Sequence, residues 1–314
     1  MKKFIYHILL FTVLFVIINA VLLFAIPKDR NSYLCEYNHK LQLLETVEQP
    51  RIIIIGGSNA AFSIDSEILE DSLQYNIVNF GLHAGIGIRY PFEDCLDYIR
   101  SNDILVIQFE YENFYNGGNG EPETFLPFMI ATDWRHCNKL NKYQLINIIK
   151  GIPATAFMNL KRLLKYPIIH SLDTQSSASK FRYTASGFNK YGDEISHFNF
   201  PNKPIPKSNI GNMQLSKQFI NWFSGMLKRC ELIGAKTIVL PPVCTESFFK
   251  NSDIESVSAI LEQIGYPYAV QPSTMVLDDK YAFDTRYHMN RDGCILNTQN
   301  LIECITPIIH SDIR

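Results

Sequence analysis

A serine near the start of the sequence and a histidine near its end are the residues best suited to covalent catalysis. Ser58 follows an apolar run, residues 52–55, and two glycines, whereas Asp284 and His288 lie close together in a later segment. A serine hydroxyl becomes nucleophilic when an imidazole takes its proton, and a carboxylate orients that imidazole and stabilises its protonated form. These residue types predict attack by Ser58 on an ester carbonyl, with His288 as the base and Asp284 as its orienting acid.

Each motif also has a purely structural interpretation. Ser58 could cap the helix that follows the two glycines, a position at which serine is favoured. His288 could pack against, or cap, a final helix that begins near Asn290. The glycine turn and the start of the following helix would also offer backbone N–H groups to an anion. A nucleotide-binding loop is not indicated, because neither GxGxxG nor GxxxxGK[ST] occurs.

Short apolar runs alternate with helical patterns along the chain, and these elements must position the candidate residues. The expected strands are residues 52–55, 77–80, 104–109 and 237–240, and the expected helices are residues 64–73, 91–99 and 213–230. Strands that are apolar on both faces and separated by helices predict a mostly parallel sheet in a three-layer α/β/α domain. Ligands bind at the carboxyl ends of such strands, which is where Ser58 stands.

The motifs at the two ends of this domain resemble those of the GDSL/SGNH hydrolase superfamily, whose fold is flavodoxin-like. They are Gly-Gly-Ser-Asn after the first strand, Val-Asn-Phe-Gly at residues 78–81, and Asp-x-x-Tyr-His-x-Asn-x-x-Gly at residues 284–293. In particular, these motifs resemble those of its membrane-anchored bacterial branch, which acts on cell-envelope glycans and their acyl groups. The resemblance covers roughly residues 51–306, and its motifs lie mainly at the two ends.

The resemblance implies the same roles for Ser58, His288 and Asp284 and adds an oxyanion hole. The superfamily builds this hole from the N–H of the nucleophile, a glycine N–H matched by Gly81, and an asparagine side chain. The usual Gly-x-Asn-Asp after the third strand is replaced here by Gln-Phe-Glu-Tyr-Glu-Asn, so the asparagine is assigned to Asn113. Asp284 and His288 are also four positions apart, one more than the superfamily's usual spacing.

Further polar residues near these motifs are candidates for substrate binding: Asn59, His83, Glu112 and Tyr287. Glu110 and Glu112 alternate beyond the third strand, so both would face one side of an extended segment. Paired carboxylates could perform glycosidase chemistry, but a hydrogen-bonding role for Glu112 is the preferred interpretation. Asp193 and His197 form a second pair with the same spacing as Asp284 and His288, for which substrate binding is the expected role.

Composition excludes several other classes of function. The formal net charge is -2, with 29 Lys and Arg against 31 Asp and Glu, so no basic excess points to a nucleic-acid partner. The seven cysteines are odd in number and form no CxxC pair, which argues against a disulfide framework and a zinc ribbon. We expect neither a metal nor a cofactor.

The N-terminus predicts a membrane anchor. Lys2 and Lys3 precede 23 residues without charge, positions 4–26, enough to cross a hydrocarbon core of about 30 Å. This run is longer than the apolar region of a cleaved signal peptide. The predicted organisation is a tail at residues 1–3, the anchor at 4–26, a stalk with a short helix at 27–50, and a hydrolase-like domain at 51–314 with an insertion at about 115–212.

The expected function follows from the candidate site together with the resemblance. We expect a serine-dependent ester hydrolase or O-acyltransferase that acts on acyl, above all acetyl, esters of envelope glycans or on small esters. A transferase would need a membrane-bound acyl-donor protein as a partner. Lysines and arginines flank the anchor on both sides, so the exported, periplasmic or extracellular orientation is implied by the resemblance alone. The alternative is an inactive envelope protein that binds glycan or assists polysaccharide assembly.

Overall fold

The computed structural model describes residues 1–25, 28–172, 183–211 and 213–310, with the backbone alone described for residues 165–172. Ile26 of the predicted anchor, residues 173–182 and 212 of the predicted insertion, and residues 311–314 of the predicted domain lie outside the described residues.

A four-stranded parallel sheet forms the centre of the domain. Its strands are β1 (Arg51–Gly56), β2 (Asn76–Asn79), β3 (Ile104–Gln108) and β4 (Lys236–Val239), in the order β2-β1-β3-β4. All three strand pairs are parallel. The four predicted strands are therefore confirmed, with ends that differ by a residue or so. A small parallel pair, β5 (Cys244–Thr245) with β6 (Val276–Leu277), was not expected from the sequence.

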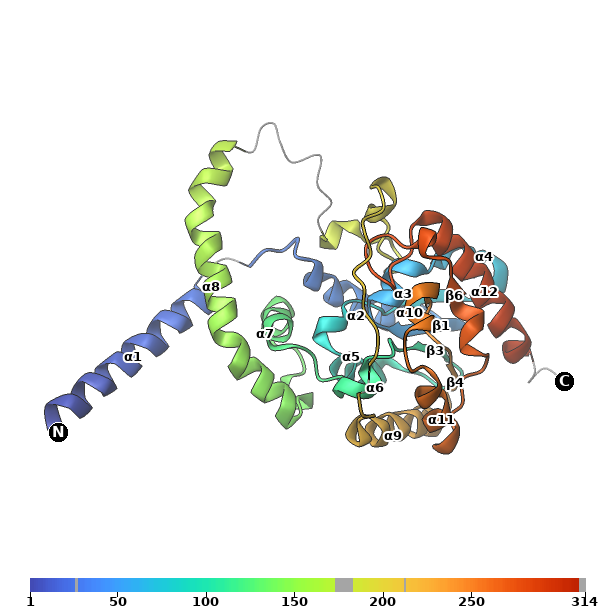
Figure 1. Cartoon of the computed structure of the whole chain (residues 1–314), viewed down its shortest axis with the longest axis horizontal. Helices are drawn as coiled ribbons and strands as arrows, with labels where there is room; N and C mark the ends of the chain where they lie inside the picture. Colours follow the sequence, from blue (N-terminus) through green and yellow to red (C-terminus); the bar gives the residue numbers. More distant parts are fainter. Residues whose placement is uncertain (26–27, 173–182, 212, 311–314) are drawn as a thin grey trace.

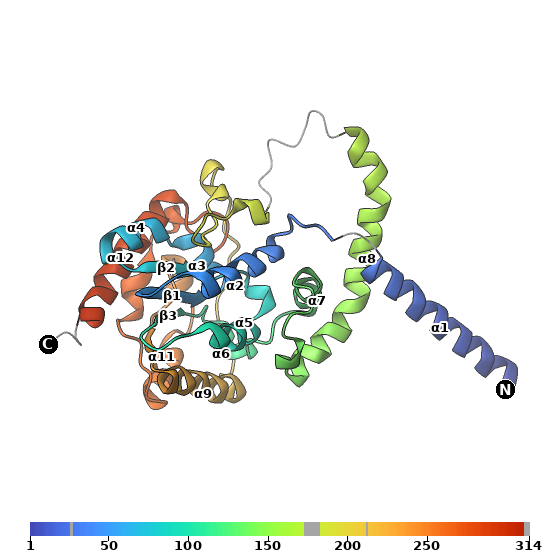
Figure 2. The same cartoon turned by 180° about the vertical axis from the view of Figure 1, so that it is seen from behind.

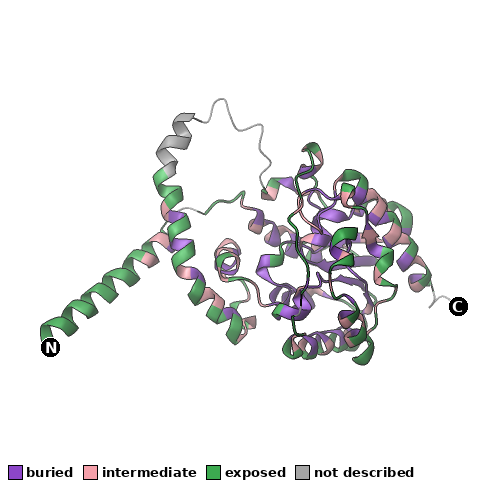
Figure 3. Cartoon of the chain, in the orientation of Figure 1, coloured by how far each residue is buried: buried purple, intermediate pink, exposed green. Residues whose placement is uncertain are grey.

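Helices cover both faces of this sheet. Ile53 and Ile55 of β1 join one apolar layer, whereas Ile52 and Ile54 join the other. The first layer is closed by α2 (Glu36–Thr46), α5 (Arg89–Cys95) and α9 (Lys217–Ile233), and the second by α4 (Ser66–Leu73) and α12 (Arg291–Ile309). Figure 3 shows the buried sheet between these helices. The chain is thus an α/β protein with a mostly parallel sheet, compatible with the predicted three layers.

Further short α-helices and 3-10 turns complete the domain. The α-helices are α3 (Ser58–Ser63), α6 (Asn113–Asn116), α10 (Glu246–Lys250) and α11 (Glu255–Gln263). The 3-10 turns are Tyr33–Cys35, Ala84–Ile86, Leu96–Tyr98, Cys137–Lys139, Ala185–Gly187, Ser196–Asn199, Pro272–Met275 and Asp279–Tyr281. The predicted helix 91–99 is α5 followed by a 3-10 turn, and the predicted helix 213–230 begins later, at Lys217.

The segment predicted as a stalk is part of the folded domain. Its expected helix is present as α2, but Tyr37, Leu41 and Leu44 of that helix are buried in the core. Lys40 is also buried, and its Nζ donates to Asn79 O at 2.8 Å and to Gly192 O. The amphipathic pattern was sufficient to predict the helix, whereas the surface that it covers is created only by the distant residues of the sheet layer.

The N-terminal helix α1 (Lys2–Phe24) is long and apolar enough to cross a membrane. It has 23 residues and a mean hydropathy of 2.7, and only Leu23 is buried. Figures 1 and 2 show it projecting away from the α/β domain.

One long helix, α8 (Lys142–Leu172), replaces the two helical pieces expected near residues 143–149 and 155–164. It packs against α1 and against α7 (Pro122–Ala131). Gly151 lies where α7 approaches most closely, because a Cβ there would be 2.3 Å from Pro122 O. The glycine thus serves the contact between two helices and does not end α8.

A fully buried ion pair fixes the start of the sheet. Arg51 Nη2 lies 2.8 Å from Asp103 Oδ2, and both side chains have no exposed surface. The guanidinium also donates to Leu44 O at 2.6 Å and to Tyr98 O at 2.8 Å. Arg51 therefore joins β1 to the end of α2 and to the turn before β3.

Asp103→Ala should destabilise the domain by about 3–5 kcal/mol, because it leaves the buried guanidinium without its counter-charge. Urea unfolding of the full chain in detergent would measure the change in unfolding free energy. Asp97→Ala is the matched control, because Asp97 is 56% exposed and pairs with Lys139 at the surface, where such pairs contribute about 0–1 kcal/mol. Equal stability of the two variants would contradict this account of Arg51.

Candidate active site

The register of two neighbouring strands places Ser58 beside Glu110. Gly56 at the end of β1 pairs with Gln108 at the end of β3. Ser58 and Glu110 each stand two residues beyond this pair, at the carboxyl edge of the sheet. The next strand along the chain from β1, β2, lies on its opposite side, so the strand order reverses between β1 and β3. Such switch points are the usual ligand sites of open parallel sheets.

The Ser58 hydroxyl donates a hydrogen bond to Glu110 Oε1 at 3.0 Å. The same oxygen accepts the N–H of Asn59 at 3.2 Å. A Cβ on Gly57 would lie 2.8 Å from that oxygen, so the glycine allows the carboxyl group to approach. The hydroxyl makes no capping hydrogen bond to α3, which leaves the helix-cap interpretation of Ser58 without support.

Burial changes the acidity of Glu110. The residue is 5% exposed, and burial raises its pKa to about 7, assisted by the neighbouring charge of Glu112. The hydrogen bonds from Ser58 and Asn59 and the charge of Arg286 act in the opposite direction. Near neutral pH this carboxyl group is therefore divided between its protonated and ionised forms.

Asp284 and His288 are hydrogen-bonded to each other. The distance from His288 Nδ1 to Asp284 Oδ1 is 2.9 Å. Burial lowers the pKa of His288, although Asp284 opposes this change. Burial alone would raise the pKa of Asp284, but the hydrogen bonds and charges around it, first from His288, hold it below its usual value. Tyr183 donates to Asp284 Oδ2, and Lys203 forms a longer ion pair with the same oxygen at 3.5 Å.

Helix α3 brings the C-terminal segment to the serine. Ser63 Oγ donates to Tyr287 O at 2.7 Å and accepts the N–H of Met289 at 3.1 Å. The ring of Phe62 stacks on the ring of His288, with centroids 4.0 Å apart and planes 10° apart. The helix that begins at the candidate nucleophile therefore also holds the candidate base.

Ser58 and His288 line one cavity of about 470 Å³. The other lining residues are Tyr33, Leu34, Phe62, His83, Ala84, Glu110, Thr124, Tyr183, Thr285, Arg286 and Tyr287. In the described conformation the serine hydroxyl bonds to Glu110, and His288 Nε2 has no hydrogen-bond partner among the described residues. The structure thus brings the two residues to one cavity, with the serine–histidine hydrogen bond not formed.

Two of the three expected oxyanion donors are engaged elsewhere. The N–H of Gly81 donates to Asn79 Oδ1 at 3.0 Å. Asn113 Nδ2 donates to Glu110 O at 3.0 Å, and Asn113 does not line the cavity with Ser58. Asn113 is the first residue of α6, and the helical turn directs its side chain back onto the backbone of Glu110. Ser58 is the first residue of α3, so its N–H has no partner within that helix.

Only two of the four expected substrate-binding residues line the cavity. His83 and Tyr287 line the cavity. Asn59 accepts the N–H of Gly57 at 3.0 Å and donates to Gln108 O at 3.0 Å, which fixes the turn after β1. Glu112 accepts hydrogen bonds from Arg286 and from the Tyr287 hydroxyl, the latter at 2.7 Å. Asn59 and Glu112 therefore do not line this cavity, although both bond to residues next to it.

His83 presents a neutral imidazole to the cavity. Its Nδ1 accepts the N–H of Gly85 at 2.8 Å, so the ring proton belongs on Nε2. Partial removal of the ring from water, with a smaller contribution from the charge of His288, lowers its pKa, although the residue keeps an exposed surface. His83 can therefore donate one hydrogen bond to a ligand at neutral pH, whereas a role as a strong base is disfavoured.

The second Asp/His pair does not form. His197 Nδ1 lies 2.5 Å from Glu194 Oε2, and its Nε2 lies 2.8 Å from Met289 O. Asp193 instead accepts hydrogen bonds from Ser66, Asn79 and Asn189. Both residues are almost fully buried, so the substrate-binding role expected for this pair is wrong.

The two glutamates considered for glycosidase chemistry do not share the cavity. Glu110 lines it, whereas the carboxylate of Glu112 binds Arg286 and Tyr287 and is not among the lining groups. No group of three or more His, Cys, Asp or Glu side chains among the described residues could hold a metal ion.

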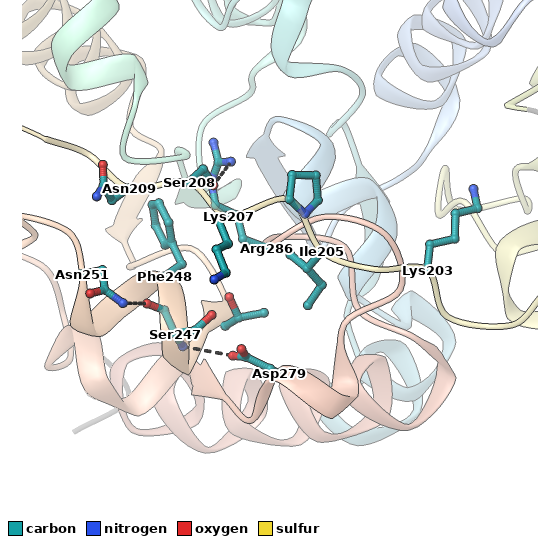
Figure 4. A pocket seen from close by; sticks show the side chains of 12 residues that line it. Lys203, Ile205, Lys207, Ser208, Asn209, Ser247, Phe248, Asn251, Asp279 and Arg286 are labelled. Atoms are coloured by element: carbon teal, nitrogen blue, oxygen red, sulfur yellow. Dashed lines mark hydrogen bonds between the residues drawn. The ribbon is translucent and has the colours of Figure 1, made fainter.

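A second cavity, of about 760 Å³, shares Arg286 with the first. Figure 4 shows its lining residues, which are mainly polar: Lys203, Ile205, Pro206, Lys207, Ser208, Asn209, Thr245, Ser247, Phe248, Asn251, Asp279 and Arg286. Arg286 Nη1 donates to Ser208 Oγ at 2.7 Å, and its guanidinium lies 4.9 Å from the centroid of the Phe248 ring. This arginine forms part of the wall of both cavities.

Several residues of the site were not predicted from the sequence. The sequence indicates Glu110 only as one of two paired carboxylates, and it does not single out Tyr33, Tyr183 or Arg286 as site residues. The signal for Glu110 was its position two residues beyond the end of β3, which matches the position of Ser58 beyond β1. Tyr33 and Tyr183 come from segments outside the predicted motifs, and no local pattern marks them.

No family model matches the sequence, and no curated protein matches it either.

Asp284→Asn should lower the pKa of the His288 ring further, because the hydrogen bond and charge of this carboxylate are the largest effects that raise it against burial. NMR titration of the ring in the full chain would measure the change, with the resonance assigned by its loss in His288→Gln. Asp292→Asn, an exposed change in the first turn of α12, is the control and should leave the titration unaltered. An unchanged His288 titration in Asp284→Asn would contradict the proposed pairing.

Proposed function

We propose that this protein is a serine-dependent ester hydrolase or O-acyltransferase of the SGNH kind, acting on acyl, above all acetyl, esters of cell-envelope glycans. The observation that carries the proposal is the shared cavity. A serine from the first strand end and a histidine bonded to an aspartate near the other end of the chain line the same space of about 470 Å³. The strand order β2-β1-β3-β4 supports it, because flavodoxin-like sheets begin with this order.

The reaction would proceed through an acyl-enzyme. Ser58 attacks the ester carbonyl, the alcohol leaves, and the acyl group passes from Ser58 to water or to a sugar hydroxyl. His288 supplies a base that Asp284 orients. The backbone N–H of Ser58 and the neutral ring of His83 are donors available to the oxyanion.

The surroundings of the cavity support a large polar substrate. The second cavity adjoins the first through Arg286 and exposes hydroxyl, amide and ammonium groups, which suit a sugar chain. The apolar helix α1 supports attachment to a membrane, with the α/β domain on the exported side. If the acceptor is a glycan hydroxyl, the acyl group would come from a membrane-bound donor protein.

A second candidate function is a binding module without catalysis. It is favoured by the missing hydrogen bond between Ser58 and His288 and by the engagement of Gly81 and Asn113 outside the cavity. Such a protein would hold a glycan or assist its assembly at the membrane, using the same two cavities.

Ser58→Ala should reduce hydrolysis of a small acetyl ester by at least about 10³-fold, because it removes the hydroxyl oxygen on which the acyl-enzyme forms. The assay uses the full chain in detergent, together with a serine-reactive phosphonate whose site of attachment is found by peptide mass spectrometry. Ser273→Ala, an exposed serine remote from the cavity, should keep full activity. Unchanged turnover in Ser58→Ala, or no label on Ser58, would favour the binding module.

A further inference from the structure

Glu110 is the acid–base group in contact with the Ser58 hydroxyl. Its Oε1 lies 3.0 Å from Ser58 Oγ, within the range required of a general base. Glu110 also lines the cavity, so the same carboxyl group faces both the nucleophile and the space for an ester. His288 reaches this cavity with its Nε2 free of other described hydrogen bonds. The two groups therefore approach the reacting centre from different elements.

We propose that Glu110 is the base for acylation and that His288 is the base for deacylation, an inference that rests on the proposed function of Ser58. In the first step the Ser58 proton passes to Glu110 as the Oγ–carbon bond forms, and Glu110 returns it to the alcohol oxygen as the ester bond breaks. In the second step His288 takes a proton from water or a sugar hydroxyl as that oxygen attacks the acyl group. His288 then returns the proton to Ser58 Oγ as the acyl bond breaks.

The surroundings of Glu110 suit such a base. Burial and the carboxylate of Glu112 raise its pKa to about 7, so its ionised form is a far better proton acceptor than an exposed glutamate. The hydrogen bonds from Ser58 and Asn59, and then the charge of Arg286, limit this rise in the pKa. Tyr33 and Tyr287 are also coupled to its charge, but burial keeps both phenols protonated.

The position of Glu110 is fixed before any substrate binds. The N–H of Asn59 donates to the oxygen that faces Ser58, and Gly57 provides the room for it. The carboxyl group of Glu110 is therefore held beside Ser58 by the backbone as well as by the serine hydroxyl. Glu110 does not have to move to accept the proton.

Glu110→Gln tests the first role, because the amide keeps an acceptor oxygen but cannot take a proton. Acylation, followed as the rate of phosphonate labelling and as ester turnover, should fall by at least about 100-fold. The rise in rate with pH through about 7 should disappear. Glu262→Gln, the same change on the exposed face of α11, is the control. Thermal melting of each variant checks that it is folded, and Glu110→Asp, which keeps the base, should recover part of the activity.

His288→Gln tests the second role. Ser58 should still be acylated, but the acyl-enzyme should accumulate and be visible as an added acyl mass on the intact chain. Normal labelling in Glu110→Gln together with loss of labelling in His288→Gln would overturn the division of roles, leaving His288 as the base for both steps. Activity that survives Ser58→Ala would instead overturn the proposed function itself, so the two failures are distinguishable.

A separate observation concerns the surface of α8. Four apolar side chains of this helix are largely exposed: Leu145 (49%), Ile149 (67%), Phe157 (57%) and Leu164 (65%). They are four, eight and seven residues apart in sequence, which places them on one face of the helix. The helix contains no Asp or Glu, whereas lysines and an arginine are spread along it. It is thus an apolar and basic surface on an otherwise mildly acidic protein.

Helix α8 lies at the end of the apolar helix α1. Asn159 Nδ2 donates to Leu22 O at 3.0 Å, and Leu23 packs with Ala156 of α8. Figures 1 and 2 both show α8 crossing α1 where α1 meets the domain. A bilayer crossed by α1 ends close to Phe24, so its surface meets α8.

We propose that the exposed face of α8 rests in the interface of the bilayer that α1 crosses, with its cationic residues on anionic headgroups. Interfacial helices combine an apolar face with flanking lysines and arginines in this way. Charge attraction between such side chains and anionic lipids adds to the apolar contact. The α/β domain would then be held at the bilayer by two crossing helices, α1 and α8, and would not turn freely on a single anchor.

A nitroxide label at residue 149 tests this placement. The full chain carries Ile149→Cys, with the accessible Cys35 and Cys137 changed to serine, and is reconstituted in vesicles of phosphatidylglycerol and phosphatidylcholine. The label should be exposed to oxygen dissolved in the bilayer and protected from a water-soluble paramagnetic reagent. Leu232→Cys on α9, where the native leucine is 80% exposed, gives the matched control in water. Equal access of the aqueous reagent to both labels would overturn the proposal, whatever the outcome at Ser58.

Discussion

The parallel pairing of Gly56 with Gln108 is the constraint on which the site depends. Parallel strands end at a common edge, so the residues that follow them meet only if the register is correct, and a shift by one residue would turn the side chains to the opposite face. Here the register sends Ser58 and Glu110 out of the sheet together. The glycine at position 57 and the side chain of Asn59 then hold the turn in the one arrangement that allows their contact.

A second constraint joins the two ends of the chain. Ser63 bonds to the backbone on both sides of His288, and Asn297 of α12 donates to Ser63 O at 2.6 Å. The imidazole therefore approaches the cavity as part of a buried network that also attaches the final helix to the sheet. The same contacts that pack the C-terminal segment also place the ring of His288. A loss of that packing would therefore remove the candidate base from the cavity.

The sequence predicted the parts of this arrangement that are encoded locally. Apolar runs such as residues 52–55 identify a buried strand by themselves, and a serine after two glycines identifies a turn that can present a hydroxyl. The partners of these groups depend on pairing between distant segments. Asn113 matched a motif by position, yet one helical turn directs it away from the cavity. Helix α2 was recognised from its pattern, but the surface that it covers is formed by residues elsewhere in the chain.

The cavity is connected to the membrane segment by a very short stretch of chain. Tyr33 lines the cavity, donates to Leu82 O and packs on Phe62 and Phe188. It follows Phe24, the last residue of α1, by only nine positions, which even a fully extended chain would span in about 30 Å. If α1 crosses a bilayer and Ser58 acts on an ester, as proposed, the chain holds the cavity wall at Tyr33 within roughly that distance of the bilayer surface. A substrate attached to the membrane, or one delivered there by a membrane-bound donor, satisfies this limit without any movement of the domain.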